Sequence, residues 1–306
     1  MKPIVIKLNN EQLQQIEKHY EKYLVETPPQ HALFAAKKNG CTITAYKSGK
    51  VMFQGINSEL EAEPWNSFIE TQPNNKQVSS AERKLPSFIE SDHIGSDEAG
   101  TGDYFGPITV AAVYATPKQQ QLLSELGVKD SKQMTDLTIK KVVKDILLTD
   151  IIYSTVTLHN VKYNELQRCG WTQGRMKAWL HHHAIKHVLN KMTEKPSGIL
   201  IDQFCEPEIF KTHILKTKEI PIENLTFLTK AESVSIPVAT ASMLARYRFL
   251  QEMDKLSQLV GFDLQKGASN IVDKQISQII KNNGENMLEQ VAKVHFANTK
   301  KGRALI

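Results

Sequence analysis

The chain of 306 residues is poor in the features that mark secreted and membrane-bound proteins. It contains only 3 cysteines, Cys41, Cys169 and Cys205, an odd number without the spacing of a metal site. No apolar run is long enough to cross a bilayer, and the first residues lack the apolar stretch and cleavage site of a secretory signal. We therefore expect a protein of the reducing cytoplasm with no membrane partner.

The sequence also lacks a strong excess of charge of one sign. Lys and Arg number 38 against 33 Asp and Glu, which gives a formal net charge of +5. An excess of this size suits a polyanionic partner without requiring one. The net charge therefore does not indicate a function, which must be inferred from the positions of particular residues.

A polar stretch without apolar periodicity, residues 72–85, divides the chain. Its Pro, Asn and Ser residues are typical of a linker. The sequence therefore predicts a first domain at residues 1–71 and a larger second domain at residues 86–306.

The first domain is predicted to be a small α+β unit. One helix would be capped by Asn10 and another would span residues 58–70. Four short strands are expected, at residues 3–6, 33–37, 41–46 and 51–54. Polar and apolar side chains alternate in the third of these strands. We therefore expect an antiparallel sheet with one face on the helices and the other free to bind.

The second domain alternates strands with helices, as α/β proteins do. The predicted strands are residues 94–96, 108–114, 151–157, 199–203 and 225–228. The predicted helices are residues 135–148, 172–192 and 234–256, with more helix after residue 269. Pro237 falls in the first turn of the third helix, where a missing N–H costs nothing.

Acidic residues stand at the ends of segments that should be buried: Asp97, Glu98, Asp202 and Glu232. Desolvation of a carboxylate is costly unless a cation neutralises it, and the sequence near Asp97 and Glu98 supplies no Arg or Lys. Oxygen-only ligands of this kind suit Mg²⁺ or Mn²⁺. The alternative is that an acid at a strand end caps a turn or a helix, which is how we interpret Asp103 and Asp130.

A glycine-rich turn, Gly100-Thr101-Gly102, follows the first acid pair. Such a turn alone is weak evidence for a dinucleotide-dependent oxidoreductase, and here Asp97 and Glu98 would repel a pyrophosphate. Glycines and acids fit together if a metal lies between protein and phosphate. The main chain can then approach a sugar–phosphate backbone and contact a ribose hydroxyl.

Five motifs, in order, resemble those of the type 2 ribonucleases H. They are SDEAGTGDYFGP, VKDSKQM, IDQF, TKAESVSIPVATASMLARY and QKGAS, and the resemblance runs from residue 94 to about residue 298. It implies a ribonuclease H-like catalytic domain, an α/β fold with a mixed sheet and flanking helices.

Departures from the ribonuclease HII pattern favour the ribonuclease HIII branch. Thr101 stands where ribonuclease HII has an arginine, Glu232 where it has an aspartate, and Ala268 where it has a tyrosine. These differences argue against a preference for a single ribonucleotide joined to DNA. The hairpin CTITAYKSGKVMFQG is similar to part of a TATA-binding-protein repeat, which ribonuclease HIII carries as an N-terminal substrate-binding domain.

The resemblance implies endonucleolytic hydrolysis of the RNA strand of RNA/DNA hybrids by two divalent ions, Mg²⁺ or Mn²⁺, with 5′-phosphate and 3′-hydroxyl products. Asp97, Glu98 and Asp202 would hold the ions, and Glu232 would be a fourth catalytic carboxylate. The substrate-binding residues would be Gly100, Thr101, Gly102, Lys132, Ser242 and Lys266.

We expect a monomer without an obligate protein partner. The rival is an inactive fold that only binds nucleic acid, but a pure binder gains nothing from acids that repel phosphate.

Other polar and sulfur-containing residues are interpreted structurally. The run WLHHHAIKHV contains His181, His182, His183 and His187. Adjacent helix residues point about 100° apart and cannot share one metal ion, so we interpret the run as a polar helix face. Lys293, in the basic C-terminal segment, would belong to a phosphate-binding stripe or to a solvated helix end. Cys169 and Cys205 are expected to be small buried residues.

Overall fold

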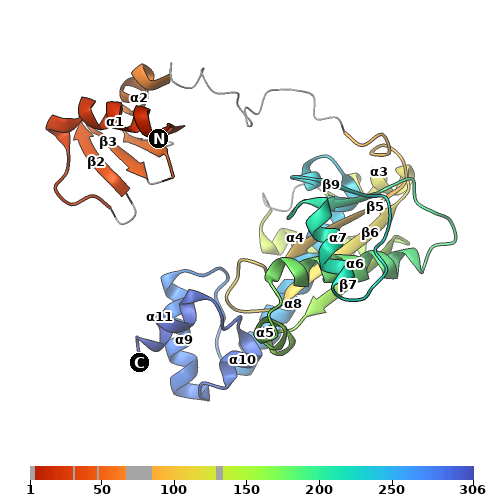
Figure 1. The fold of residues 1–306 in the computed structure, drawn as a ribbon. Helices are drawn as coiled ribbons and strands as arrows, with labels where there is room; N and C mark the ends of the chain where they lie inside the picture. Colours follow the sequence, from red (N-terminus) through yellow and green to blue (C-terminus); the bar gives the residue numbers. More distant parts are fainter. Residues whose placement is uncertain (1–3, 30–31, 47, 67–84, 129–133) are drawn as a thin grey trace. The chain divides into compact units, whose positions relative to one another are not determined.

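The structure, a computed structural model, describes residues 4–29, 32–46, 48–66, 85–128 and 134–306. The chain divides into two compact units, Met1–Arg83 and Lys84–Ile306 (Figure 1). The predicted linker at residues 72–85 lies outside the described residues except for residue 85. Each unit is described by itself below.

The described part of the N-terminal unit is a 4-stranded antiparallel sheet with helices α1 (Asn10–His19) and α2 (Ser58–Asn66). The strand order is β1-β4-β3-β2. The strands are β1 (Ile4–Lys7), β2 (Ala32–Lys38), β3 (Cys41–Tyr46) and β4 (Lys50–Gly55). The predicted α+β architecture is confirmed.

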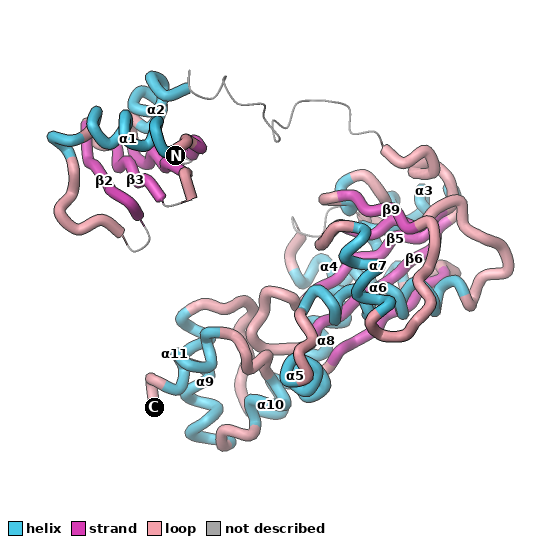
Figure 2. The backbone as a smooth tube through the Cα atoms, in the orientation of Figure 1, coloured by secondary structure: helices cyan, strands magenta, loops and turns pink. Residues whose placement is uncertain are grey.

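The helices cover one face of this sheet, as the alternation in β3 predicts (Figure 2). Cys41, Ile43 and Ala45 are buried in the core that the helices share with the sheet, whereas Thr42 and Tyr46 remain partly exposed; Thr44, between them on the same face, is only 3% exposed, so the expected exposure fails there. Since side chains alternate along a strand, the opposite face carries the polar residues.

The cap of α1 differs from the expectation. Asn9, not Asn10, is the N-cap: its side chain accepts a hydrogen bond from the Gln12 backbone N–H at 2.9 Å, and the Gln12 side chain accepts one from Asn9 N–H. This reciprocal capping box requires Gln or Glu three residues after the cap. Only Asn9 has that neighbour, so the prediction of Asn10 was wrong by one residue.

The C-terminal unit contains a mixed 5-stranded sheet of order β7-β6-β5-β8-β9. Its central strand β5 pairs antiparallel with β6 and parallel with β8. The strands are β5 (His93–Ala99), β6 (Ile108–Ala115), β7 (Ile152–Leu158), β8 (Ile199–Asp202) and β9 (Leu225–Leu228). The predicted ribonuclease H-like arrangement, a mixed sheet with flanking helices, is confirmed.

Helices cover both faces of this sheet. On one face, Ile108, Val110 and Ala112 of β6 pack with α6 (Gln173–Leu189). On the other face, Ala111 and Val113 pack with α8 (Ile236–Val260). The apolar run of β6 is therefore buried on both sides, which explains its lack of polar alternation.

The remaining helices surround this core and extend it toward the C-terminus (Figure 1). They are α3 (Pro117–Glu125), α4 (Asp136–Ile146), α5 (Asn160–Arg168), α7 (Pro207–Leu215), α9 (Asn270–Asn283), α10 (Met287–Val291) and α11 (Ala297–Arg303), with the short 3₁₀ helix η4 (Ala231–Ser233). In the described part of the chain, no helix is both long enough and apolar enough to cross a membrane.

Helix α8 begins and ends later than the sequence indicated. Ser235 is its N-cap, Pro237 lies in its first turn as predicted, and the helix continues to Val260. It stops there because Gly261 adopts the left-handed conformation, with φ 85°. The helix thus runs past the sheet and reaches the C-terminal helices through Phe249 and Met253.

Candidate active site

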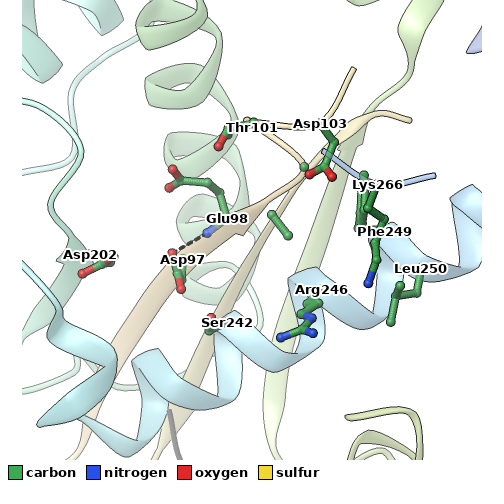
Figure 3. Close-up of a pocket in the computed structure, with 13 residues that line it drawn as sticks. Asp97, Glu98, Thr101, Asp103, Asp202, Ser242, Arg246, Phe249, Leu250 and Lys266 are labelled. Atoms are coloured by element: carbon green, nitrogen blue, oxygen red, sulfur yellow. Dashed lines mark hydrogen bonds between the residues drawn. The ribbon is translucent and has the colours of Figure 1, made fainter. Parts of the chain in front are cut away.

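Three of the four acids predicted from strand ends, Asp97, Glu98 and Asp202, line one cavity of about 540 Å³ in the C-terminal unit (Figure 3). Asp97 and Glu98 come from the end of β5, and Asp202 comes from the end of its parallel neighbour β8. Parallel strands bring their carboxyl ends to the same edge, which is why residues so distant in sequence meet here. The cavity is lined by Asp97, Glu98, Ala99, Gly100, Thr101, Gly102, Asp103, Asp202, Ser242, Arg246, Phe249, Leu250 and Lys266.

Asp97 is the most buried of these acids, with 6% of its surface exposed. One carboxylate oxygen accepts a hydrogen bond from the Glu98 backbone N–H at 2.7 Å, and the Ser242 hydroxyl of α8 donates another. Burial raises the pKa of Asp97 well above its ordinary value, and the negative charges of Glu98 and Asp202 raise it further. Asp97 pairs with no Lys or Arg among the described residues, so its negative charge has no protein counter-ion there.

Glu98 points to the other face of β5, toward α6 (Figure 3). Its Oε1 lies 2.7 Å from Lys177 Nζ, and its Oε2 lies 2.9 Å from His181 Nε2. Burial pushes the pKa of Glu98 upward, but the hydrogen bonds and charges of His181 and Lys177 outweigh it, and the pKa lies below its ordinary value. Glu98 is therefore an ionised carboxylate already engaged by two donors.

Asp202 is tied to the segment that carries Glu232. Its Oδ1 accepts a hydrogen bond from the Ala231 backbone N–H at 2.8 Å, at the start of η4. Glu232 follows directly and is 4% exposed, but it is not among the residues that line the cavity. Three of the four predicted carboxylates therefore share the cavity wall, and the fourth lies behind it.

These acids do not form a ready-made metal site. Among the residues that the structure describes, no group of three His, Cys, Asp or Glu side chains is arranged to hold an ion. The direction of Glu98, toward Lys177 and His181, separates its carboxylate from that of Asp97.

The glycine-rich turn forms the adjacent wall of the cavity. Gly100 has φ 88°, and a Cβ there would lie 2.8 Å from the Phe249 ring, so only glycine fits. Gly102 and Thr101 line the cavity, and the Thr101 carbonyl accepts a hydrogen bond from Gln173 Nε2 at 3.0 Å. Asp103 accepts a hydrogen bond from the Gly267 backbone N–H at 2.6 Å, a contact between distant parts of the chain and not a cap of its own turn.

Two cationic side chains, Arg246 and Lys266, also line the cavity and share one acid. Arg246 Nη2 lies 2.7 Å from Asp136 Oδ1, and Lys266 pairs with the other oxygen of Asp136. Lys266 was predicted as a substrate contact, whereas Arg246 was not selected by any sequence pattern. Their place on the cavity wall suits them to the phosphates of a substrate. Lys132, another predicted contact, lies outside the described residues.

Three structural interpretations from the sequence were wrong. The polar helix face was wrong for His181 and His182, which are 0% and 1% exposed and pack inward, whereas His183 is partly exposed and His187 is exposed. Lys293 is fully buried and contacts no solvent, so it belongs to no phosphate stripe. Cys169 is exposed at the end of α5, and Cys205 is only partly buried.

Lys293 instead fixes the loop that follows the glycine-rich turn. Its Nζ donates hydrogen bonds to the carbonyls of Asp103 at 2.8 Å and Gly106 at 2.5 Å, and it lies 5.9 Å from the centroid of the Tyr163 ring. Burial lowers the pKa of Lys293 to about 7, although the charge of Asp103 opposes this shift. A neutral amine keeps two N–H donors, enough for both carbonyls.

Comparison with known proteins agrees with this geometry. Residues 94–299 match the family described as Ribonuclease HII, and residues 3–78 match a domain of unknown function, DUF3378. Ribonuclease HIII of Oceanobacillus iheyensis is 48% identical over 99% of both chains, and that of Bacillus licheniformis is 46% identical over 98% of this chain and 97% of its own. The crystal structure of Bst-RNase HIII in complex with Mn²⁺ matches with a TM-score of 0.71 and 41% identity over 99% of both chains.

The mixed sheet and its acidic cavity define a nuclease of the ribonuclease H type. The chain belongs to the ribonuclease HIII family, endoribonucleases that cleave the RNA of RNA/DNA hybrids. The resemblance identified from the five motifs is thereby confirmed, and a dinucleotide-dependent oxidoreductase is excluded.

The buried lysine predicts a pH dependence of stability. The pKa of Lys293 is lowered to about 7 in the folded state. Between pH 7 and the ordinary pKa of a lysine, the unfolded chain therefore binds more protons than the folded chain. The free energy of unfolding must then rise with pH over this range. We expect wild type to gain about 2 kcal/mol relative to Lys293→Met between pH 7 and pH 9. Urea denaturation at both pH values measures this difference. Lys300→Met, at an exposed lysine, is the control. A difference in unfolding free energy between wild type and Lys293→Met that does not change with pH would contradict the lowered pKa of Lys293.

Proposed function

We propose that Asp97, Glu98 and Asp202 hold two divalent cations, Mg²⁺ or Mn²⁺, in this cavity. The observation that carries the proposal is the burial of Asp97 beside two other carboxylates, which raises its pKa well above the ordinary value. A dication removes that repulsion and allows all three acids to be ionised together. The Mn²⁺ complex of Bst-RNase HIII supports this class of ion.

When bound, the ions would supply Lewis acidity that activates water and stabilises the leaving 3′ oxygen, giving 5′-phosphate and 3′-hydroxyl ends. The chain's own contribution is to hold the acids at the ends of β5 and β8 and to hold Asp97 with Ser242. Glu232 is proposed as the fourth catalytic carboxylate because η4 joins it to Asp202 through Ala231.

The remaining walls suit a hybrid duplex. Gly100, Thr101 and Gly102 allow the main chain to approach a ribose, and the 2′-OH is the group that distinguishes the cleaved strand from DNA. Arg246 and Lys266 would take phosphates next to the cleaved bond, and Ser242 would contact the same backbone. Lys132 keeps its proposed role as a phosphate contact on the sequence motif alone.

The N-terminal unit is proposed to bind the hybrid through the open face of its sheet. Two of the three polar residues of β3 on that face, Thr42 and Tyr46, are partly exposed, and the third, Thr44, is buried. We propose that the chain acts as a monomer in the cytoplasm, where the exposed thiol of Cys169 stays reduced.

The metal site is tested by cleavage of a labelled RNA/DNA hybrid in Mg²⁺ or Mn²⁺, with EDTA, DNA/DNA duplex and RNA/RNA duplex as controls. We expect EDTA to abolish cleavage and Asp97→Asn to reduce the rate by a factor of about 10³ or more while hybrid binding in EDTA is retained. Asn keeps the size of the side chain but removes the charge that holds an ion. Turnover of Asp97→Asn near that of wild type would exclude Asp97 as a metal ligand.

The glycine-rich turn makes a second prediction about substrate choice. Because Thr101 replaces the arginine of ribonuclease HII, we expect a duplex with one embedded ribonucleotide to be cleaved much more slowly than one with four consecutive ribonucleotides. Steady-state kcat/KM on the two duplexes measures the preference. Equal values would show that Thr101 does not set it.

A further inference from the structure

The carboxylate of Glu98 is held by two donors from the same face of α6. Lys177 Nζ lies 2.7 Å from Oε1 and His181 Nε2 lies 2.9 Å from Oε2, so both oxygens are engaged. The side chains of Lys177 and Glu98 are only 14% and 12% exposed, and His181 is fully buried. An ion pair screened from water to this degree is stronger than a surface pair, so releasing Glu98 has a real cost.

Both donors rest on one aromatic ring. Lys177 Nζ lies 4.0 Å from the centroid of the Phe204 ring, and His181 stacks on the same ring at 5.1 Å with an interplanar angle of 22°. His181 Nδ1 also lies 2.7 Å from Ser96 Oγ, which fixes the ring from its other side. Phe204 follows Asp202 by two residues, so the loop that carries one predicted ligand also supports the group that holds another.

The two donors differ in how they oppose an ion. His181 is wedged between Ser96 and Phe204 and cannot move far. Lys177 carries a full positive charge on a flexible stem, within hydrogen-bond distance of the carboxylate that an ion would need. A dication that takes the lone pair of Oε1 used by Lys177 must displace this side chain, and a dication at any other lone pair of the Glu98 carboxylate lies close to its positive charge.

We infer that Lys177 is a positioning residue that competes with divalent cations for Glu98, holding this carboxylate on the α6 side until an ion displaces it. The inference rests on the proposed metal site and deepens it. It explains why the acids of the cavity are not arranged around one point, since the carboxylate of Glu98 is engaged elsewhere. Lys177 thereby sets the ion concentration at which the acids come together.

The test is the binding of Mn²⁺ alone, without substrate, measured by isothermal titration calorimetry at constant ionic strength. We expect Lys177→Met to bind Mn²⁺ about tenfold more tightly than wild type, because the competing charge is gone while the apolar stem remains on Phe204. Lys177→Arg keeps the charge and should bind with nearly wild-type affinity. The control is Lys186→Met, which removes a lysine of the same helix that pairs with Glu219.

Thermal unfolding of each variant shows that it is folded, and the Mn²⁺ concentration for half-maximal hybrid cleavage should fall in Lys177→Met. Unchanged or weaker Mn²⁺ binding by folded Lys177→Met would overturn the inference. Asp97→Asn separates this result from failure of the metal site itself. Loss of Mn²⁺ binding in Asp97→Asn with wild-type affinity in Lys177→Met rejects only the role of Lys177. Full binding in Asp97→Asn rejects the proposed site and the inference with it.

Discussion

The structure of the catalytic unit depends on one constraint: a carboxylate, Asp97, is held on the central strand of a sheet that is covered on both faces. Burial and two neighbouring acids raise its pKa, so its place in the fold is unfavourable for negative charge, as expected if the proposed cation neutralises it. The hydrogen bond from Ser242 supplies only part of the lost solvation. A buried carboxylate beside two other acids contributes nothing favourable to core packing, and it fits the proposed metal site.

The alternation of β5 sends its two adjacent acids to different helices. Asp97 faces α8, which contributes Ser242, whereas Glu98 faces α6, which contributes Lys177 and His181. The sheet therefore places one acid without a counter-ion beside another that is already paired, and the two have pKa shifts of opposite direction. Opposite pKa shifts in neighbouring carboxylates are common where the two acids have different roles in one reaction.

The sequence predicted the strands, several of the helices and the acids because these follow from local patterns, whereas α3, α5 and α7 were not predicted. Strand alternation and strand ends identify Asp97 and Asp202 without knowledge of the fold. The partners of Glu98 could not be found in this way, since Lys177 and His181 lie 79 and 83 residues away and meet it only when α6 packs on the sheet. Lys293 was misinterpreted for the same reason: its acceptors lie 187 and 190 residues away, so its burial is a property of tertiary packing.

The measurement that tests this account most directly is the anomalous scattering of Mn²⁺ in crystals of the chain soaked with that ion. The account predicts peaks within bonding distance of the Asp97 and Asp202 carboxylates, with Glu98 turned away from Lys177 toward the ions. Peaks elsewhere on the chain, with Asp97 still buried without an ion, would contradict it.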